Sequence, residues 1–191
     1  MKPVVLASTS QWRRQILADA GVDAEAVDPG VDESLLVGNG PVETAQMRAA
    51  AKARAGANLR PDALVIGADQ VVHLDGEAIG KPVDEADWYA RLASMRGRSH
   101  QLTTAVALVD EADEEAFHVT TAVRLRADVS DEEIRQYIRH GEASGCAGGY
   151  MVERRGAWLV ESVDGDWLNV VGLPVLAVVG RLRARGWRMP Q

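Results

Sequence analysis

Hydroxyl and cationic side chains gather close to the N-terminus, where the sequence predicts a strand, a turn and a helix. Ser8 and Ser10 lie in the turn, and Arg13 and Arg14 follow in the first helical turn. The helix macrodipole is positive there, so each cation costs on the order of 0.3–1 kcal/mol unless an anion offsets it. The free N–H groups of such a turn can cradle a phosphate while arginines hold its oxygens. A surface arginine pair beside hydroxyls that merely cap the helix is an equally good interpretation.

Acidic and further basic side chains follow in separate segments. Asp69 closes the apolar run 63–69, where we expect a strand to end and where α/β sheets commonly present catalytic groups. Glu33 lies in a polar loop, and Lys52 and Lys81 are candidates to neutralise phosphate charge. Taken singly, each has a plainer interpretation as a turn residue or a solvated surface charge. Together they supply what triphosphate hydrolysis needs, namely cations for the leaving pyrophosphate and carboxylates that hold metal and aim water.

Composition and missing motifs exclude several other classes of protein. Lys and Arg total 21 against 28 Asp and Glu, a formal charge of −7, which disfavours a nucleic-acid polymer as partner. The sequence holds no P-loop, no complete dinucleotide fingerprint and no G-x-S-x-G elbow, and we interpret the single Cys146 as structural. No apolar run reaches the roughly 18 residues of a membrane span, and no signal peptide is evident. We therefore expect a cytoplasmic protein that does not enter a membrane.

The elements that must position these side chains alternate between strand and helix. Hydrophobic periodicity, capping residues and turn signals predict strands over 3–7, 63–69, 99–109 and 117–127, with short extended segments at 150–153 and 158–163. The segment 71–79 carries Asp75-Gly76, which is a hairpin-turn signal. The same signals predict helices from the turn at 8–10 to Gly21, and over 41–59, 84–95, 130–140 and 175–185, with a capping box at 130–133 and a loop over 27–40. No repeat or linker interrupts this alternation, so we expect one α/β domain over residues 1–191.

Nearly end to end, these residues resemble the Maf family, also called septum formation inhibitor proteins. The resemblance rests on motifs that follow one another in order: Leu6-Ala7-Ser8-Thr9-Ser10, Trp12-Arg13-Arg14, Val31-Asp32-Glu33, Lys52-Ala53, Ile66-Gly67-Ala68-Asp69-Gln70-Val71, Gly80-Lys81-Pro82, Gly97-Arg98, Ala147-Gly148-Gly149-Tyr150 and Val171-Gly172-Leu173-Pro174. The sequence departs from the family at Gln11, where the family usually has proline.

The resemblance implies a Maf and ITPase-like α/β fold with an elongated mixed sheet and a central cleft between two lobes. It also implies hydrolysis of a nucleoside triphosphate between its α and β phosphates, with a divalent metal such as Mg²⁺ or Mn²⁺, and a possible homodimer. By position, Asp69 would be the proton acceptor and would hold the metal with Glu33. The substrate phosphates would be bound by Ser8, Arg13, Arg14, Lys52 and Lys81.

The resemblance also implies that three further positions separate the branches of this family by base preference, and here they are Trp12, Gln70 and Glu153. They look like the branch that acts on 7-methyl-GTP. A carboxylate at Glu153 can accept hydrogen bonds from N1–H and N2–H of guanine, and a Trp12 face would add about 0.5–2 kcal/mol of cation–π attraction to the methylated ring. The plainer interpretation is a core aromatic at Trp12 and a solvated acid at Glu153.

Two alternatives remain open beside this substrate. The first is the same chemistry on dTTP or UTP, and Tyr150 resembles that pyrimidine branch at least as much. The second is a non-catalytic regulator of septum formation, as the older family name suggests. A regulator that only binds has no need of an aimed carboxylate, so the charged residues favour an enzyme.

Overall fold

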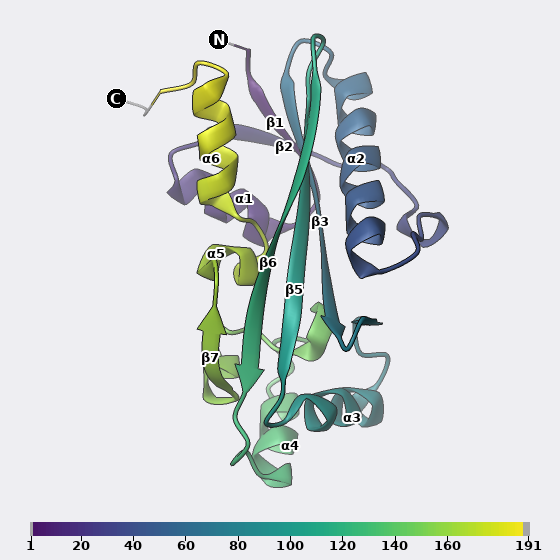
Figure 1. Cartoon of the computed structure of the whole chain (residues 1–191), viewed down its shortest axis with the longest axis vertical. Helices are drawn as coiled ribbons and strands as arrows, with labels where there is room; N and C mark the ends of the chain where they lie inside the picture. The colour runs from purple at the N-terminus through teal and green to yellow at the C-terminus, as the bar shows by residue number, and fades with distance from the viewer. Residues whose placement is uncertain (1, 189–191) are drawn as a thin grey trace.

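A mixed seven-stranded sheet forms the centre of the molecule in the computed structural model, which describes residues 2–188 (Figure 1). The strand order is β2-β1-β3-β5-β6-β7, with β4 paired to β3. β1 lies parallel to β2 and β3, and the other pairs are antiparallel. The strands are β1 Val4–Ala7, β2 Ala24–Val27, β3 Leu64–Leu74, β4 Glu77–Ile79, β5 Ser99–Val109, β6 Glu114–Leu125 and β7 Val160–Asp164.

Helices cover this sheet, and three of them begin at capping side chains that the sequence predicts. They are α1 Gln11–Asp19, α2 Pro41–Leu59, α3 Glu85–Met95, α4 Asp131–Arg139, α5 Trp167–Val171 and α6 Val175–Ala184, with short 3₁₀ turns at Glu33–Leu35, Ala147–Gly149 and Arg155–Trp158. Ser10 caps α1 by accepting from the Arg13 amide, and Ser130 and Glu133 form the predicted capping box of α4. These helices satisfy their first N–H groups with local side chains, which is why their starting points can be predicted from sequence.

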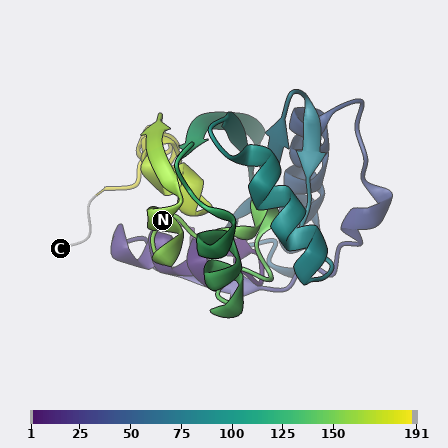
Figure 2. The same cartoon turned by 90° about the horizontal axis from the view of Figure 1, so that it is seen from below.

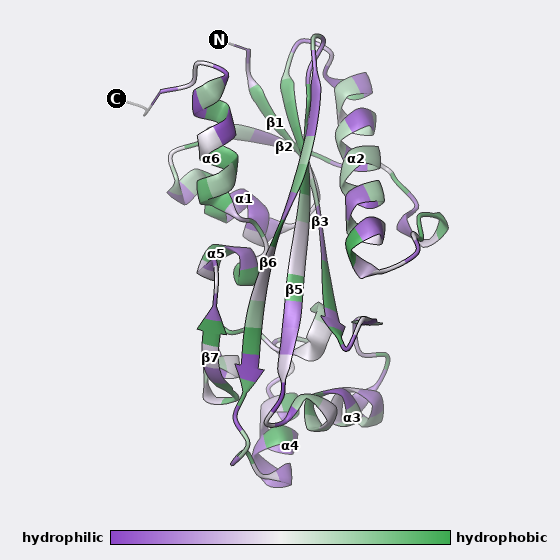
Figure 3. Cartoon of the chain, viewed as in Figure 1, coloured by the Kyte–Doolittle hydropathy of each residue, from purple (hydrophilic) through white to green (hydrophobic). Residues whose placement is uncertain are grey.

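The long strands β3, β5 and β6 run through two lobes that each have a hydrophobic core. One core lies at the end of the molecule that faces the viewer in Figure 2. There α3 and α4 pack on the sheet around Trp88, Leu92 and Ile134. The other packs α1 and α6 around Leu17 and Val178, with β1 coloured hydrophobic along its length in Figure 3. The predicted α/β fold with an elongated mixed sheet is therefore confirmed.

β3 corrects the expectation that a strand ends at Asp69. The strand continues to Leu74, because β5 pairs with it throughout, with Asp69 opposite Ala105. On the other side, the parallel neighbour β1 stops at Ala7, opposite Gly67. Asp69 thus lies in mid-strand, just past the point where one flanking strand ends and leaves room for a cavity.

α2 lies very close to β3, and glycine makes this approach possible. A Cβ atom at Gly67 would lie 2.3 Å from the carbonyl oxygen of Ala49 and 2.5 Å from the amide nitrogen of Ala53. The alanines on this face of α2 likewise add little bulk, so the helix backbone packs directly against the strand. One turn of α2 is thereby held directly over the strand segment that carries Asp69.

Other segments differ from the sequence-based expectations. β2 and α5 were not predicted, since each is too short to show a clear hydrophobic period. The segment 150–153 is not a strand: Gly148 and Gly149 adopt positive φ, and the carbonyl of Gly149 accepts from the Trp88 indole, which turns the chain away from the sheet. Within residues 2–188, no helix is both long and apolar enough to cross a membrane.

Candidate active site

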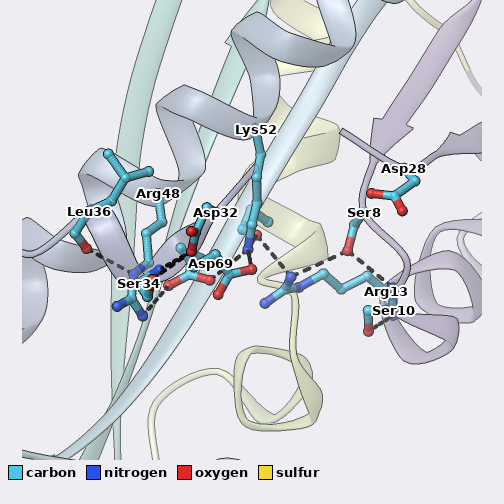
Figure 4. A network of polar contacts seen from close by, with 12 residues as sticks. Ser8, Ser10, Arg13, Asp28, Asp32, Ser34, Leu36, Arg48, Lys52 and Asp69 are labelled. Carbon is cyan, nitrogen blue, oxygen red and sulfur yellow. Dashed lines mark hydrogen bonds and ion pairs between the residues drawn. The ribbon is translucent and has the colours of Figure 1, made fainter. Parts of the chain in front are cut away.

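A cavity of about 1100 Å³ lies beside β3, and it gathers nearly all of the predicted site residues. Its walls come from the turn between β1 and α1, the loop before α2, the middle of β3, the segment after β4, and the 145–153 and 170–172 segments. Predicted residues on these walls are Ser8, Trp12, Arg13, Glu33, Lys52, Asp69, Gln70, Lys81 and Glu153. Figure 4 shows the charged part of this cavity, where Lys52 and Arg48 reach from α2 toward Asp69.

Lys52 is the centre of the charged group. Its ammonium donates to Oδ1 of Asp69 at 2.8 Å and lies 2.7 Å from Oε1 of Glu33. Both Lys52 and Asp69 are buried, at 6% and 5% exposure, whereas Glu33 comes from an exposed loop. A buried lysine between two carboxylates satisfies the rule that buried charges are paired, and it holds both acids at one point of the cavity.

Arg13 approaches the same point from the other side, anchored by backbone carbonyls. Its Nε donates to the carbonyl of Gly172 at 3.0 Å, and its Nη1 donates to the carbonyl of Ala68 at 2.8 Å. Burial lowers the pKa of Arg13, and the charges of Asp69 and Glu33 partly offset that effect. The remaining nitrogen, Nη2, makes none of the hydrogen bonds found among residues 2–188, so it is free for an anionic ligand.

The turn before α1 presents hydroxyl side chains to the cavity. Ser8 Oγ accepts from the Ser10 amide at 3.2 Å, and Arg13 Nη1 lies 3.5 Å from the same oxygen. Ser8, Thr9 and Ser10 all line the cavity. The predicted strand, hydroxyl turn and helix are present and Ser10 caps the helix, while phosphate binding at this turn stays a prediction.

The structure does not bring Arg14 to this group. Arg14 is exposed on α1 and does not line the cavity, while its neighbour Arg13 does. Successive residues on an α-helix point about 100° apart, so Arg13 and Arg14 leave the helix in different directions. Lys81 lines the cavity from the segment after β4, exposed and at its edge. The phosphate roles of Arg14 and Lys81 remain predictions.

Arg48 is a site residue that the sequence reasoning missed. Its Nη1 lies 4.0 Å from Oδ2 of Asp69, and its Nε donates to the carbonyl of Leu36 at 3.0 Å, which ties α2 to the loop that carries Glu33. The signal was present in the spacing, since Arg48 and Lys52 are four residues apart and so share one face of a helix.

The cations hold Glu33 in its charged form. Partial burial by itself would raise the pKa of Glu33, but the hydrogen bond and charge of Lys52, followed by the charges of Arg48 and Arg13, lower it overall. The carboxylate is therefore ionised at neutral pH and ready to act as an oxygen ligand.

Glu33 and Asp69 fit a divalent cation whose remaining ligands would be phosphate oxygens and water. Oδ2 of Asp69 is buried and has no hydrogen-bond partner within the described chain. Glu33 and Asp69 contact the same ammonium and so lie side by side. No group of three or more His, Cys, Asp or Glu residues in 2–188 could hold a metal alone. Two carboxylates with phosphate oxygens and water make the ligand set that Mg²⁺ prefers.

The three predicted specificity residues also line this cavity. Gln70 is half-buried on β3, and its amide nitrogen donates to Thr104 Oγ1 and to the carbonyl of Asn169. Burial raises the pKa of Glu153, Glu142 raises it further, and Arg154 lowers it. The Arg154 guanidinium lies 4.9 Å from the centre of the Trp12 ring. Trp12 also packs against the core of the lobe that contains α3 and α4, so the interpretation of Trp12 as a core aromatic is partly correct.

Comparison with known families decides what kind of site this is. The family model described as Maf-like protein matches residues 3–185. The chain belongs to the Maf family. Among solved structures, the Ham1 protein of Staphylococcus aureus is similar over 65% of this chain and 72% of that one, with a TM-score of 0.47 and 18% identity.

Curated Maf relatives match over almost their whole length. The chain is 40% identical to the dTTP/UTP pyrophosphatase of Symbiobacterium thermophilum, with 98% of this chain and 96% of that protein covered. It is 39% identical to the dTTP/UTP pyrophosphatase of Dictyoglomus thermophilum, with 98% of each covered. It is 41% identical to the nucleoside triphosphate pyrophosphatase of a Synechococcus species, with 91% and 89% covered.

These comparisons confirm the Maf assignment and the expectation of an enzyme, a nucleotide pyrophosphatase that hydrolyses an acid anhydride. They do not support the finer prediction of the 7-methyl-GTP branch. The relatives from Symbiobacterium thermophilum and Dictyoglomus thermophilum are both named dTTP/UTP pyrophosphatase. The 7-methyl-GTP prediction rested on three positions alone, whereas these relatives are similar over 98% of the chain.

Proposed function

We propose that this Maf chain hydrolyses nucleoside triphosphates to a nucleoside monophosphate and pyrophosphate in the cavity beside β3. The observation that carries the proposal is the Lys52 ammonium shared by Asp69 and Glu33, with Arg13 and Arg48 on either side. Alternating acids and bases at one buried point suit a polyphosphate and a cation better than they suit an apolar ligand.

In this proposal, Asp69 accepts the proton of the attacking water. Lys52 occupies its Oδ1, which leaves Oδ2 as the free acceptor. A water oxygen bonds to the α-phosphorus, the bond from that phosphorus to the bridging oxygen breaks, and the water proton passes to Asp69 while pyrophosphate leaves. Arg13, Lys52 and Arg48 stabilise the negative charge that develops on the phosphates.

A divalent cation belongs to this proposal. Glu33 and Asp69 would hold it, and when bound it supplies positive charge that polarises the phosphate and lowers the pKa of water. The helix turn at Ser8 and Ser10 and the Nη2 atom of Arg13 bind phosphate oxygens without help from the metal.

Pyrophosphate release tests the proposal directly. Purified protein with Mg²⁺ or Mn²⁺ should release pyrophosphate, and Asp69→Asn should lower kcat by about 10²–10⁴-fold, the usual contribution of a general base. The same substitution at the exposed Asp75, the first residue of the β3–β4 turn, is the matched control and should leave kcat unchanged. Wild-type turnover in Asp69→Asn would remove Asp69 from the reaction, and no release from any nucleotide would favour a binding role such as regulation of septum formation.

For the base, we infer a preference for dTTP and UTP. The inference rests on relatives of that name that are 38–40% identical over nearly the whole chain. The position of Arg154 over the Trp12 ring supports it, because a ring that already contacts one cation is a poorer partner for the cationic base of 7-methyl-GTP.

7-Methyl-GTP is the second candidate, and the half-buried carboxylate of Glu153 favours it. Glu153 lines the same cavity as Gln70, and a carboxylate there can accept two hydrogen bonds from a guanine edge. Measuring kcat/KM for dTTP, UTP, CTP, GTP and 7-methyl-GTP separates the two candidates. We expect dTTP and UTP to be the best substrates. A tenfold or greater preference for 7-methyl-GTP that Glu153→Gln abolishes would instead establish the second candidate, since about this discrimination is expected from one lost polar contact.

A further inference from the structure

Gln70 is held in one orientation by the main chain of α5. Its Nε2 donates to the carbonyl of Asn169 at 2.6 Å and to Thr104 Oγ1 at 2.9 Å. A backbone carbonyl can only accept, so the nitrogen of this amide must face Asn169. Thr104 lies directly opposite Gln70 in the β3–β5 register and takes the second amide hydrogen.

The oxygen of Gln70 is therefore the atom left for a ligand. Gln70 lines the cavity, and none of the hydrogen bonds found among residues 2–188 uses its Oε1. A fixed acceptor selects a base whose ring nitrogen carries a hydrogen. Uracil and thymine at N3 and guanine at N1 meet this condition, whereas cytosine and adenine present a bare ring nitrogen at the matching place.

The Asn169 side chain fixes the segment that sets this orientation. It is fully buried, and its Nδ2 lies 3.0 Å from the carbonyl of Leu102, 3.2 Å from that of Val119 and 3.0 Å from Thr121 Oγ1. These acceptors belong to β5 and β6, so one side chain fastens α5 across two strands. Thr121 adds to the attachment, because it exchanges hydrogen bonds with the main chain of Asp166 at the start of α5.

The same short segment also anchors the phosphate end of the cavity. Gly172 follows α5 directly, and its carbonyl accepts from Nε of Arg13. One backbone segment thus contacts both Gln70 and Arg13. A shift of this segment would move Gln70 and Arg13 together, and misplacement by about 1 Å can cost on the order of 100-fold in rate.

We propose that Asn169 is a positioning residue for base selection: by fastening α5 to β5 and β6 it keeps the Gln70 amide oxygen turned into the cavity, so that bases with a ring N–H are preferred over cytosine and adenine. The proposal rests on the proposed function, because it assumes that a nucleotide base lies beside Gln70. Asn169 itself does not line the cavity.

The first test needs no nucleotide. In the wild-type protein, NMR should show the Gln70 side-chain amide protons protected from exchange with solvent, since both are hydrogen-bonded inside the fold. In Asn169→Ala, the protection should fall by about tenfold or more as α5 loosens. Unchanged protection would overturn the positioning role of Asn169. Because this test uses no nucleotide, its result does not depend on whether the proposed function is correct.

The second test measures base selection by binding. Calorimetry with the non-hydrolysable α,β-methylene analogues of UTP and CTP should give a wild-type preference for the uracil analogue of about tenfold or more. In Asn169→Ala this ratio should fall toward one, because a released Gln70 amide can turn its N–H to cytosine N3. An unchanged ratio would overturn the proposal, and binding of neither analogue by the wild-type protein would overturn both it and the proposed function.

Two further variants separate positioning from stability. Thr104→Val removes one partner of the Gln70 nitrogen and leaves α5 intact, so it should lower the preference for the uracil analogue by a smaller factor. If Asn169→Ala does not fold, this variant tests the proposal in its place. Leu182→Ala removes a buried side chain from α6 in the other lobe core. It should lower the melting temperature without changing the ratio, and an equal change in ratio would show that instability alone weakens base selection.

Discussion

Lys52 determines the character of the site at the scale of single residues. It is a buried cation that pairs with a buried acid and a more exposed one, and it does so where the substrate phosphates are proposed to bind. Such a lysine both compensates Asp69 in the free protein and offers charge to a phosphate. Its contribution to stability and its contribution to turnover can therefore be measured on the same variants.

Replacing Lys52 with methionine should affect both properties. The Asp69 carboxylate would be left buried without its partner, which destabilises a fold by about 3 kcal/mol. Urea unfolding measures this loss, and pyrophosphate release should fall by at least about tenfold because phosphate charge is no longer neutralised. Lys52→Arg, which keeps the charge, is the matched variant and should lose less stability. If Lys52→Met unfolded at the wild-type urea concentration, the buried pair with Asp69 would not exist in solution.

At the scale of elements, the contact between α2 and β3 builds the site. The helix supplies Arg48 and Lys52, the strand supplies Asp69 and Gln70, and Gly67 lets the two backbones meet. Because each of these side chains has a fixed length, the separation between helix and strand sets the distance from ammonium to carboxylate.

Adding one methyl group should test that separation. In Gly67→Ala the new Cβ would meet backbone atoms of α2 at 2.3 and 2.5 Å, so the helix must move outward. We expect a loss of about 1–3 kcal/mol in stability, with a melting temperature lower by about 2–4 °C per kcal/mol, together with reduced turnover. Calorimetry and the pyrophosphate assay measure the two effects.

Gly180→Ala on α6 provides the control for this prediction. No atom lies within 4 Å of a Cβ at this exposed helical position, so alanine should be neutral or stabilising by about 0.5–1 kcal/mol. Equal behaviour of the two variants would show that α2 does not depend on the close approach at Gly67.

At the scale of the whole molecule, two lobes share one sheet and the cavity lies between them. The lobe that contains α3 and α4 buries His100 at 1% exposure, with Nε2 2.6 Å from the hydroxyl of Tyr150. Tyr150 lines the cavity, so this contact joins β5 to the cavity wall. Burial, followed by the charge of His73, lowers the pKa of His100 to about 4.

That pKa predicts how stability depends on pH. The unfolded chain, with a histidine pKa near 6.5, binds the proton before the folded protein does, so this contribution is fully present above pH 6.5, falls as the pH drops from 6.5 to 4, and levels off below. The slope reaches about 1.4 kcal/mol per pH unit. Urea unfolding at pH 7, 6 and 5 measures it. His100→Asn should flatten the profile, whereas a change at the exposed His140 should not, and parallel profiles for wild type and His100→Asn would refute the buried neutral histidine.

The sequence by itself determined the local structure and the inventory of the site. The bounds of α2 and β5 were predicted as observed, because Pro41 opens the helix and the strand shows a long hydrophobic run. The start of α4 was predicted because its capping box is formed by neighbours in the chain. Most of the acids and bases that line the cavity were also named from residue type and order, since phosphate chemistry needs those types, but Arg48 was not.

Only the tertiary structure decided how these residues combine. Lys52 meets Asp69 because Gly67 and the alanines of α2 let two elements touch, and Arg14 turns away because its neighbour faces the cavity. Asn169 fastens α5 across strands about 50 and 67 residues away along the chain. Periodicity and capping report interactions between residues a few positions apart, whereas these contacts depend on how distant elements pack, and packing is fixed only when the whole core forms.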